Sequence, residues 1–312
     1  MVRPASLAAA ATALVVGLGC GGDSARDPER RRPPAGAPAS ARPPLCTRLR
    51  ARVTGQVDTP AATELSGLVL SRSQKGVLWT HNDSGDQARL LAVAPDGRAL
   101  ADVALTGAQN ADWEDIALGG TPEGGDALYV GDIGDNEAER SSVAVYRIDE
   151  PRPAQGGPQS ATARKLTFRY PDGPHDAEAL LADPSSGDLV IVTKSFDGKA
   201  GVYVADPPRD GSTTVLRRAG NLALGAAEAV TAGDLSADGR TIVIRTYGSL
   251  FTWSRRAGES VASALRRRAC AARADLLVEG QSEAVALTPN GRAFYTVPEG
   301  DQPSIRRWAP VK

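Results

Sequence analysis

The segment Asp112-Trp-Glu-Asp-Ile-Ala-Leu118 decides the fold, because its pattern of a carboxylate before a short apolar run recurs along the chain. Copies of this pattern begin at Ser66, Glu114, Glu178, Glu228 and Glu283, with Ser in place of the acid in the first copy. The steps between copies are 48, 64, 50 and 55 residues. A repeat of this length is typical of the blades of a β-propeller.

Each copy is followed by turn residues and further β-rich runs, and helical periodicity is almost absent. Second runs lie at 77–81, 127–130, 189–193, 241–245 and 293–297, third runs at 89–93, 143–148, 201–205 and 249–253, and fourth runs at 100–105, 164–170, 213–218 and 274–278. We therefore predict an all-β fold with a single β-propeller of about five four-stranded blades, with six as the alternative count. The regular period disfavours a two-sheet sandwich.

The last repeat ends at Trp308 to Lys312, before a fourth strand can form. The β-rich run at 50–57 lies just before the first repeat, so we predict that this N-terminal strand completes the last blade. Such closure removes unpaired sheet edges. Cys46 and Cys270 are an even pair in a chain that we expect to be exported, so we predict a disulfide between them. The alternative is two separate buried thiols.

The N-terminal residues have the features of an export signal. Arg3 is followed by an apolar run from Leu7 to Leu18 that is too short to span a bilayer. Gly17-Leu-Gly-Cys20 resembles the lipobox of bacterial lipoproteins, which implies lipidation of Cys20, although Gly17 stands where Leu is usual and ordinary signal-peptidase cleavage competes. We predict a signal peptide over 1–20, a disordered tether over 21–44 and the propeller over 45–312.

These features predict an exported protein of the cell envelope, periplasmic or at the cell surface, or otherwise a secreted one. We expect it to meet the membrane only through its N-terminal lipid. The net charge of −1 offers no reason to expect nucleic acid binding. We expect a monomer whose partner is a small polar molecule or another molecule at the cell surface.

Two sets of loops carry the unusual polar residues, and in a propeller both sets open on the same face. The loops that enter the first strands supply candidate metal ligands: Asp112, Glu114, Asp176, Glu178, Glu228 and Glu283. The loops between second and third strands supply candidate ligand-binding residues: Asn82, Asp83, Asp86, Asp132, Asp135 and Asn136. Like charges about 4 Å apart repel by roughly 4 kcal/mol at a partly screened site. A cation, counter-charges or protonation must offset that repulsion.

Oxygen ligands without Cys or clustered His favour calcium, with magnesium as the second choice. His175 is a candidate general base, and Lys194 and Arg245 are candidate substrate-holding or counter-charge residues. The alternative is structural. Acids at the start of inner strands can accept backbone N–H bonds from the next blade, and Asp is a common turn former.

The phrases at 82–86, 112–117, 129–136 and 175–180 resemble those of uncharacterised exported bacterial β-propeller proteins. This resemblance spans about Glu64 to Glu283 and implies the fold but no activity. More distantly, the acids before the inner strands are similar to those of calcium-dependent propellers, the esterase-like phytase-related and the gluconolactonase and paraoxonase types. That similarity implies calcium in a central tunnel and hydrolysis of phosphoesters or lactones. Those propellers usually have six blades, and no phosphate-binding Lys and Arg cluster is evident here.

Two hypotheses follow from the sequence. The first is a binding propeller whose acidic face holds a divalent cation and a polar ligand or partner. The alternative is a calcium-dependent hydrolase of a small ester, lactone or phosphoester, with metal-bound carboxylates and His175 as base. Both uses occur on this architecture, so the fold alone does not choose between them.

Overall fold

The computed structural model describes residues 42–153, 159–206 and 211–311. Within these residues the predicted all-β fold is confirmed, and helix is limited to α1 (Val261–Leu265) and the 3₁₀ turn Leu276–Glu279. The predicted signal peptide, Cys20 and most of the predicted tether lie outside the described residues. No helix in the described ranges is long and apolar enough to cross a membrane.

The strands form five consecutive units of four, which we number in chain order. Unit 1 contains β2 (Leu65–Leu70), β3 (Leu78–Asn82), β4 (Arg89–Val93) and β5 (Ala99–Thr106), and unit 2 contains β6 (Trp113–Gly120), β7 (Asp126–Asp132), β8 (Val143–Ile148) and β9 (Gln159–Arg169). Unit 3 contains β10 (Ala177–Ala182), β11 (Leu189–Thr193), β12 (Gly201–Ala205) and β14 (Arg217–Asn221). Unit 4 contains β15 (Val230–Leu235), β16 (Thr241–Thr246), β17 (Leu250–Ser254) and β18 (Cys270–Ala271). Unit 5 contains β19 (Ala286–Leu287), β20 (Phe294–Thr296), β21 (Ser304–Pro310) and β1 (Leu49–Gln56).

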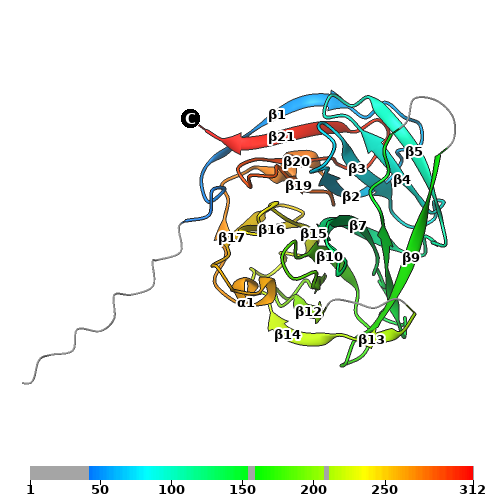
Figure 1. The fold of residues 1–312 in the computed structure, drawn as a ribbon. Coiled ribbons are helices and arrows are strands. Elements are labelled where there is room, and N and C mark those ends of the chain that lie inside the picture. Colours follow the sequence, from blue (N-terminus) through cyan, green and yellow to red (C-terminus); the bar gives the residue numbers. More distant parts are fainter. Residues whose placement is uncertain (1–41, 154–158, 207–210, 312) are drawn as a thin grey trace, which may run out of the picture. The chain divides into compact units, whose positions relative to one another are not determined.

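Neighbouring strands inside every unit are antiparallel. Units 1 and 2 are joined into one larger sheet because their last strands, β5 and β9, pair in parallel. The short strand β13 (Thr213–Val215) also pairs in parallel with β9. The first strand of each unit contacts the first strands of the units before and after it, from β2 through β6, β10, β15 and β19 and back to β2. Figure 1 shows β2, β10, β15 and β19 near the middle of the body.

The N-terminal strand completes the last unit, as predicted. β1 runs antiparallel to β21, with Leu49 opposite Pro310 and Gln56 opposite Ser304. The predicted disulfide between Cys46 and Cys270 is present, with the two Cα atoms 5.7 Å apart. The bond therefore ties the segment before β1 in unit 5 to β18 in unit 4.

The apolar core is divided among the interfaces between consecutive units. Five clusters of buried side chains occur, and each cluster draws its residues from two neighbouring units. One of them joins unit 5 to unit 1, for example Ala286 to Leu68, so the series of interfaces closes on itself. Every residue of β6 and of β10 is buried because sheets cover both faces of these strands. Burial of apolar surface at these interfaces holds the units together.

The predicted fourth strands are wrong in two places. Residues 274–278 do not form a strand, because the 3₁₀ turn Leu276–Glu279 directs Leu276 and Glu279 into the core. The last strand of unit 4 is instead β18, which pairs with β17. The predicted strand at 213–218 is two strands: β13 adds to unit 2, and β14 completes unit 3.

Candidate cation-binding site

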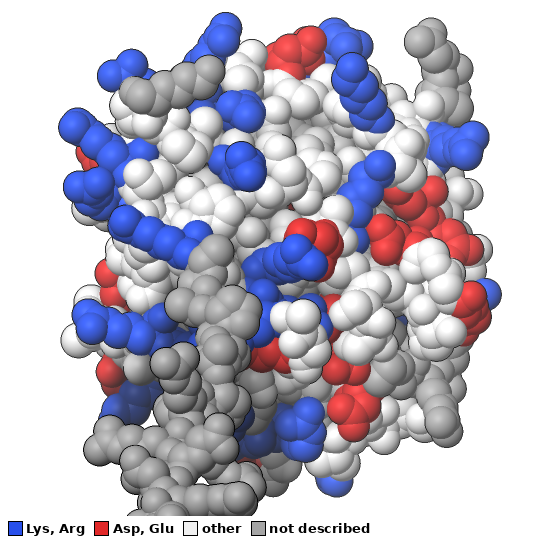
Figure 2. Space-filling view, turned by 60° about the vertical axis from the view of Figure 1, so that its left-hand side comes forward, with Lys and Arg blue, Asp and Glu red and all other residues white. Residues whose placement is uncertain are grey.

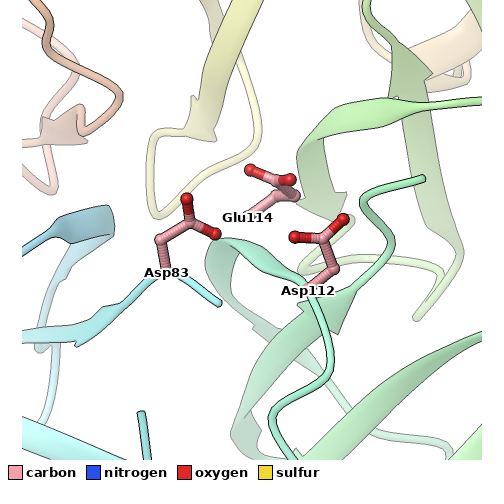
Figure 3. Close-up of side chains that lie close together, drawn as sticks. All are labelled: Asp83, Asp112 and Glu114. Carbon is pink, nitrogen blue, oxygen red and sulfur yellow. The ribbon is translucent and has the colours of Figure 1, made fainter. Parts of the chain in front are cut away.

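Three loops bring carboxylates together. Asp83 follows β3, Asp112 and Glu114 lie at the start of β6, and Asp176 and Glu178 lie at the start of β10. One oxygen each from Asp83, Asp112 and Glu114 lie within 4.8 Å of one another, and Figure 3 shows these three side chains pointing toward a common centre. Glu114, Asp176 and Glu178 form a second such group. Glu114 therefore belongs to both groups.

Local irregularities in the strands place the two glutamates in equivalent positions. The pairing register shifts between Trp113 and Asp115 in β6 and between Ala177 and Ala179 in β10. A shift of this kind leaves one residue out of the ladder and redirects its side chain. The residues left out are Glu114 and Glu178.

The two glutamates are buried but weakly satisfied. Glu114 is 3% exposed and Glu178 is 2% exposed. The carboxylate of Glu114 takes no hydrogen bond from any residue of the described ranges. Oε2 of Glu178 is also buried without a hydrogen-bond partner there. Because a buried charge without a partner is costly, this centre favours a positive ion.

The loop after β7 covers the cluster through Gly134. A methyl group on Gly134 would lie 2.2 Å from Oε1 of Glu114 and 2.5 Å from Oδ2 of Asp112. The amide of Asp135 donates to Oδ1 of Asp176 over 3.0 Å. The absence of a side chain at Gly134 lets the backbone approach both carboxylates.

Burial and mutual repulsion raise the pKa values of three carboxyls in the cluster. Burial raises the pKa of Asp83 to about 6, and the charge of Asp112 adds to this effect. Burial and the charge of Glu178 raise the pKa of Glu114 far above its usual range. Burial and the charge of Asp176 raise the pKa of Asp112. Asp83, Asp112 and Glu114 therefore retain protons at a pH where exposed carboxyls are ionised, unless a cation replaces the protons.

Lys194, predicted as a catalytic or counter-charge residue, forms an ion pair with Glu178 and lies at the cluster. Burial lowers the pKa of the ammonium, but the charge and hydrogen bond of Glu178, together with the charges of Tyr247 and Glu283, outweigh burial and raise the pKa. The ammonium also lies 5.6 Å from the centre of the Tyr247 ring. Lys194 is therefore a fixed positive charge within the acidic face.

Glu283 and Glu228, the other two predicted metal ligands, have partners of their own. Oε1 of Glu283 accepts a hydrogen bond from the hydroxyl of Tyr247 over 2.9 Å. Burial raises the pKa of Glu178, and the negative charge of Glu283 raises it further. The carboxylate of Glu228 accepts from Thr246 Oγ1 over 2.5 Å and from Ser249 Oγ over 2.8 Å. Neither residue belongs to the two carboxylate groups.

Most of the predicted ligand-binding residues shape the loops. Oδ1 of Asn82 accepts from the amide of Glu64 over 3.3 Å, and Asp86 pairs with Arg89. Asp135 accepts from the amides of residues 139 and 140, each over 2.9 Å. Asn136 is exposed. These contacts match the turn-forming alternative raised from the sequence.

Asp132 has a partner that the sequence analysis did not single out. Arg140 donates to Oδ1 of Asp132 over 2.8 Å and to the backbone oxygen of Gly134 over 2.6 Å. Arg140 thereby holds the loop that covers the cluster. Its signal in the sequence is only its place in the same long loop between β7 and β8.

His175 and Arg245, the other predicted catalytic residues, are engaged in other contacts. Nε2 of His175 lies 3.1 Å from Oδ1 of Asp172 and 2.8 Å from the hydroxyl of Tyr203. Arg245 is fully buried, with Nη2 of its guanidinium 2.7 Å from Oε2 of Glu279. Arg245 therefore has no exposed surface with which to hold a substrate in this structure.

Asp115 and Asp234 are the inner-strand acids that accept backbone N–H bonds from other units, the structural role raised above as an alternative. Oδ2 of Asp115 accepts from the amides of Leu180 over 2.9 Å and Gly233 over 3.1 Å, in units 3 and 4. Oδ2 of Asp234 accepts from the amide of Leu287 over 2.6 Å, in unit 5. These two carboxylates join first strands of different units, and neither belongs to the two carboxylate groups.

Charged side chains are unevenly distributed on the surface. Figure 2 brings forward the side of the body with β17 and α1, where Lys and Arg predominate to the left and Asp and Glu to the right of centre. In the Arg-rich segment 266–268, Arg266 and Arg268 are exposed and Arg267 pairs with Glu259 over 3.0 Å. The side chains of Arg266 and Arg268 are therefore solvated.

Comparison with known proteins adds no relative from which a role could be transferred. The chain matches no protein-family model, and no curated protein is significantly similar to it. The carboxylate cluster is therefore the feature of the protein from which a role can be proposed.

Proposed function

We propose that this protein is a five-bladed β-propeller of the cell envelope, anchored by a lipid on Cys20, whose acidic face binds a divalent cation. Through that cation the face would bind a polar ligand or a partner at the cell surface. The five four-stranded units and the closed series of first-strand contacts support five blades over six. The disulfide supports an exported location, because such bonds persist in oxidising compartments.

The observation that carries the proposal is the carboxylate of Glu114. It is buried, lacks a hydrogen-bond partner within the described ranges and points toward Asp83 and Asp112. Calcium binds oxygen at about 2.3–2.6 Å, so two of its ligand atoms lie at most about 5 Å apart. The oxygens of Asp83, Asp112 and Glu114 satisfy that limit.

Calcium fits this set better than magnesium. Calcium accepts six to eight oxygens in flexible geometry, whereas magnesium requires a near-regular octahedron and keeps much of its water. Three carboxylates from two separate loops, without any nitrogen or sulfur ligand, form an irregular anionic site. Open coordination positions would be taken by water or by oxygens of the ligand.

The hydrolase alternative receives less support. Of the three residues assigned to catalysis from the sequence, only Lys194 lies at the carboxylate cluster. His175 is bonded to Asp172 and Tyr203, and Arg245 is buried against Glu279. A panel of lactones and phosphoesters, assayed with calcium and with Glu178→Gln as control, tests this alternative. Calcium-dependent turnover that the substitution abolishes would favour hydrolysis over binding.

The cation proposal is tested by thermal unfolding after chelator treatment, with calcium or magnesium added back. An ion that binds only the folded state stabilises it by about 2.7 kcal/mol at a concentration of about 100 times Kd. We expect calcium to raise the unfolding midpoint and Asp112→Asn to remove most of that rise. Glu228→Gln is the matched control, because Glu228 is an entry-loop acid outside both carboxylate groups. No midpoint change with either ion in the native protein would refute the proposal.

A further inference from the structure

The two carboxylate groups that share Glu114 differ in their counter-charge. Group A consists of Asp83, Asp112 and Glu114, and group B consists of Glu114, Asp176 and Glu178. In the described part of the chain no Lys or Arg forms an ion pair with a residue of group A; the charge of Arg140 acts on Asp112, but Arg140 is paired with Asp132. Group B already holds a cation from the protein, since Lys194 is paired with Glu178.

The ammonium of Lys194 has two neighbours at the cluster, the carboxylate of Glu178 and the ring of Tyr247. The Lys194 side chain is 14% exposed and that of Glu178 is 2% exposed, so water screens their attraction weakly. The centre of the Tyr247 ring lies 5.6 Å from the ammonium, and the Tyr247 hydroxyl is fixed by a hydrogen bond to Glu283. An ammonium in such a setting is a compact point charge, as a metal ion is.

Group B nevertheless keeps unused acceptor capacity. Oε2 of Glu178 is buried and has no hydrogen-bond partner among the described residues. Glu114, which group B shares with group A, also accepts no hydrogen bond there. The buried Oε2 of Glu178 points to a place for a cation that one ammonium fills incompletely.

We infer that Lys194 takes the place of a second divalent cation, so that the face binds one ion in group A and none in group B. Glu114 lies between the two groups and is a ligand of the bound ion. Removing the ammonium creates a second site made of Glu114, Asp176 and Glu178, suited to a hard divalent cation such as calcium. This inference rests on the proposed cation binding in group A.

A purely structural role for Lys194 leads to a different expectation. Loss of one partner from a buried ion pair destabilises a protein because the other charge is left uncompensated. If that were the whole role of Lys194, its replacement would destabilise the protein without changing the number of ions bound. The number of ions per chain therefore separates the two roles.

The test counts calcium ions per chain by isothermal titration calorimetry and by equilibrium dialysis. Lys194→Met removes the ammonium, and Lys194→Gln keeps an amide that can donate to Glu178 if the Met variant folds poorly. Lys199→Met is the matched control, because Lys199 is exposed in the same loop. Lys194→Arg keeps a positive charge at the position.

We expect one ion per chain for the native protein, Lys199→Met and Lys194→Arg, and two for Lys194→Met and Lys194→Gln. The lowered unfolding midpoint of these two variants should recover in calcium. The double variant Lys194→Met with Glu178→Gln should return to one ion. One ion in the native protein and still one in both Lys194→Met and Lys194→Gln overturns the inference alone. No ion in the native protein refutes the proposed function itself.

Discussion

Replacing Glu114 by Gln should stabilise the cation-free protein and abolish its response to calcium. Glu114 is buried, accepts no hydrogen bond within the described ranges and faces the carboxylates of Asp83 and Asp112. Gln has nearly the same shape but carries no charge. The substitution therefore removes a cost in the absence of cation and removes a ligand in its presence.

The size of this effect follows from the pKa of Glu114, which burial and the charge of Glu178 raise far above the ordinary value of 4.5. A carboxyl whose pKa is higher in the folded state stabilises that state fully at a pH below its unfolded-state pKa. This contribution to the free energy of unfolding is lost as the pH rises toward the folded-state pKa. The loss is about 1.4 kcal/mol per pH unit. We expect the gain from Glu114→Gln to be near zero at pH 4.5 and to reach at most about 5 kcal/mol at pH 8.

The assay is urea unfolding from pH 4.5 to pH 8 in the presence of a chelator, repeated with calcium. Glu228→Gln is the control, because Glu228 accepts hydrogen bonds from Thr246 and Ser249. Its replacement should destabilise the protein by about 1–3 kcal/mol. A Glu114→Gln variant that is less stable than the native protein, or whose gain in unfolding free energy does not grow with pH, would contradict this prediction. A calcium response that survives the substitution would remove Glu114 from the ligand set.

The remaining predictions concern the covering loop, the buried ion pair, the disulfide and pH. Gly134→Ala should weaken calcium binding at least tenfold in calorimetry, because the added methyl group would lie 2.2 Å from Glu114 Oε1. Gly225→Ala is the control, because the nearest atom to its added methyl group would be 3.4 Å away. Arg245→Met should cost at most about 5 kcal/mol in urea unfolding, because Glu279 would keep only Arg306, 4.0 Å away, as a charged partner. The folded protein should still bind one calcium ion. Reducing the Cys46–Cys270 bond should cost roughly 2–5 kcal/mol, and a Cys270→Ser variant should not respond to reductant. Calcium affinity should fall as the pH is lowered from 8 to 5, because burial raises the pKa of Asp83 to about 6 and protons then compete with the ion. An affinity that does not change with pH in this range would exclude Asp83 as a ligand.

Local sequence patterns were sufficient to predict most strands. The predicted runs at 89–93, 143–148, 189–193 and 201–205 coincide with β4, β8, β11 and β12. These runs are apolar on both faces and are bounded by turn residues, and both features are properties of the segment itself. The outermost strands were harder to predict because only one side is covered, so their apolar pattern is weak.

Unit 4 shows how a repeat can mislead. The sequence pattern aligns Glu228 with Glu178, yet the register shift in β15 falls between Val230 and Ala232. Thr231 therefore occupies the position that Glu178 occupies in β10, and Glu228 stays in the loop before the strand. Ala residues flank both glutamates, so the sequence alone does not reveal this offset of three residues.

The sequence by itself determined the all-β class, the closure of the last unit by the N-terminal strand and the pairing of Cys46 with Cys270. These features depend on periodicity, strand order and an even cysteine count. Only the tertiary structure decided which acids meet, because Asp83 and Glu114 come from different units. The tertiary structure also decided that Lys194 lies at the carboxylate cluster and that Arg245 is buried against Glu279. The physical reason is that side-chain direction and distance at the cluster depend on strand register and unit packing, which local patterns do not encode.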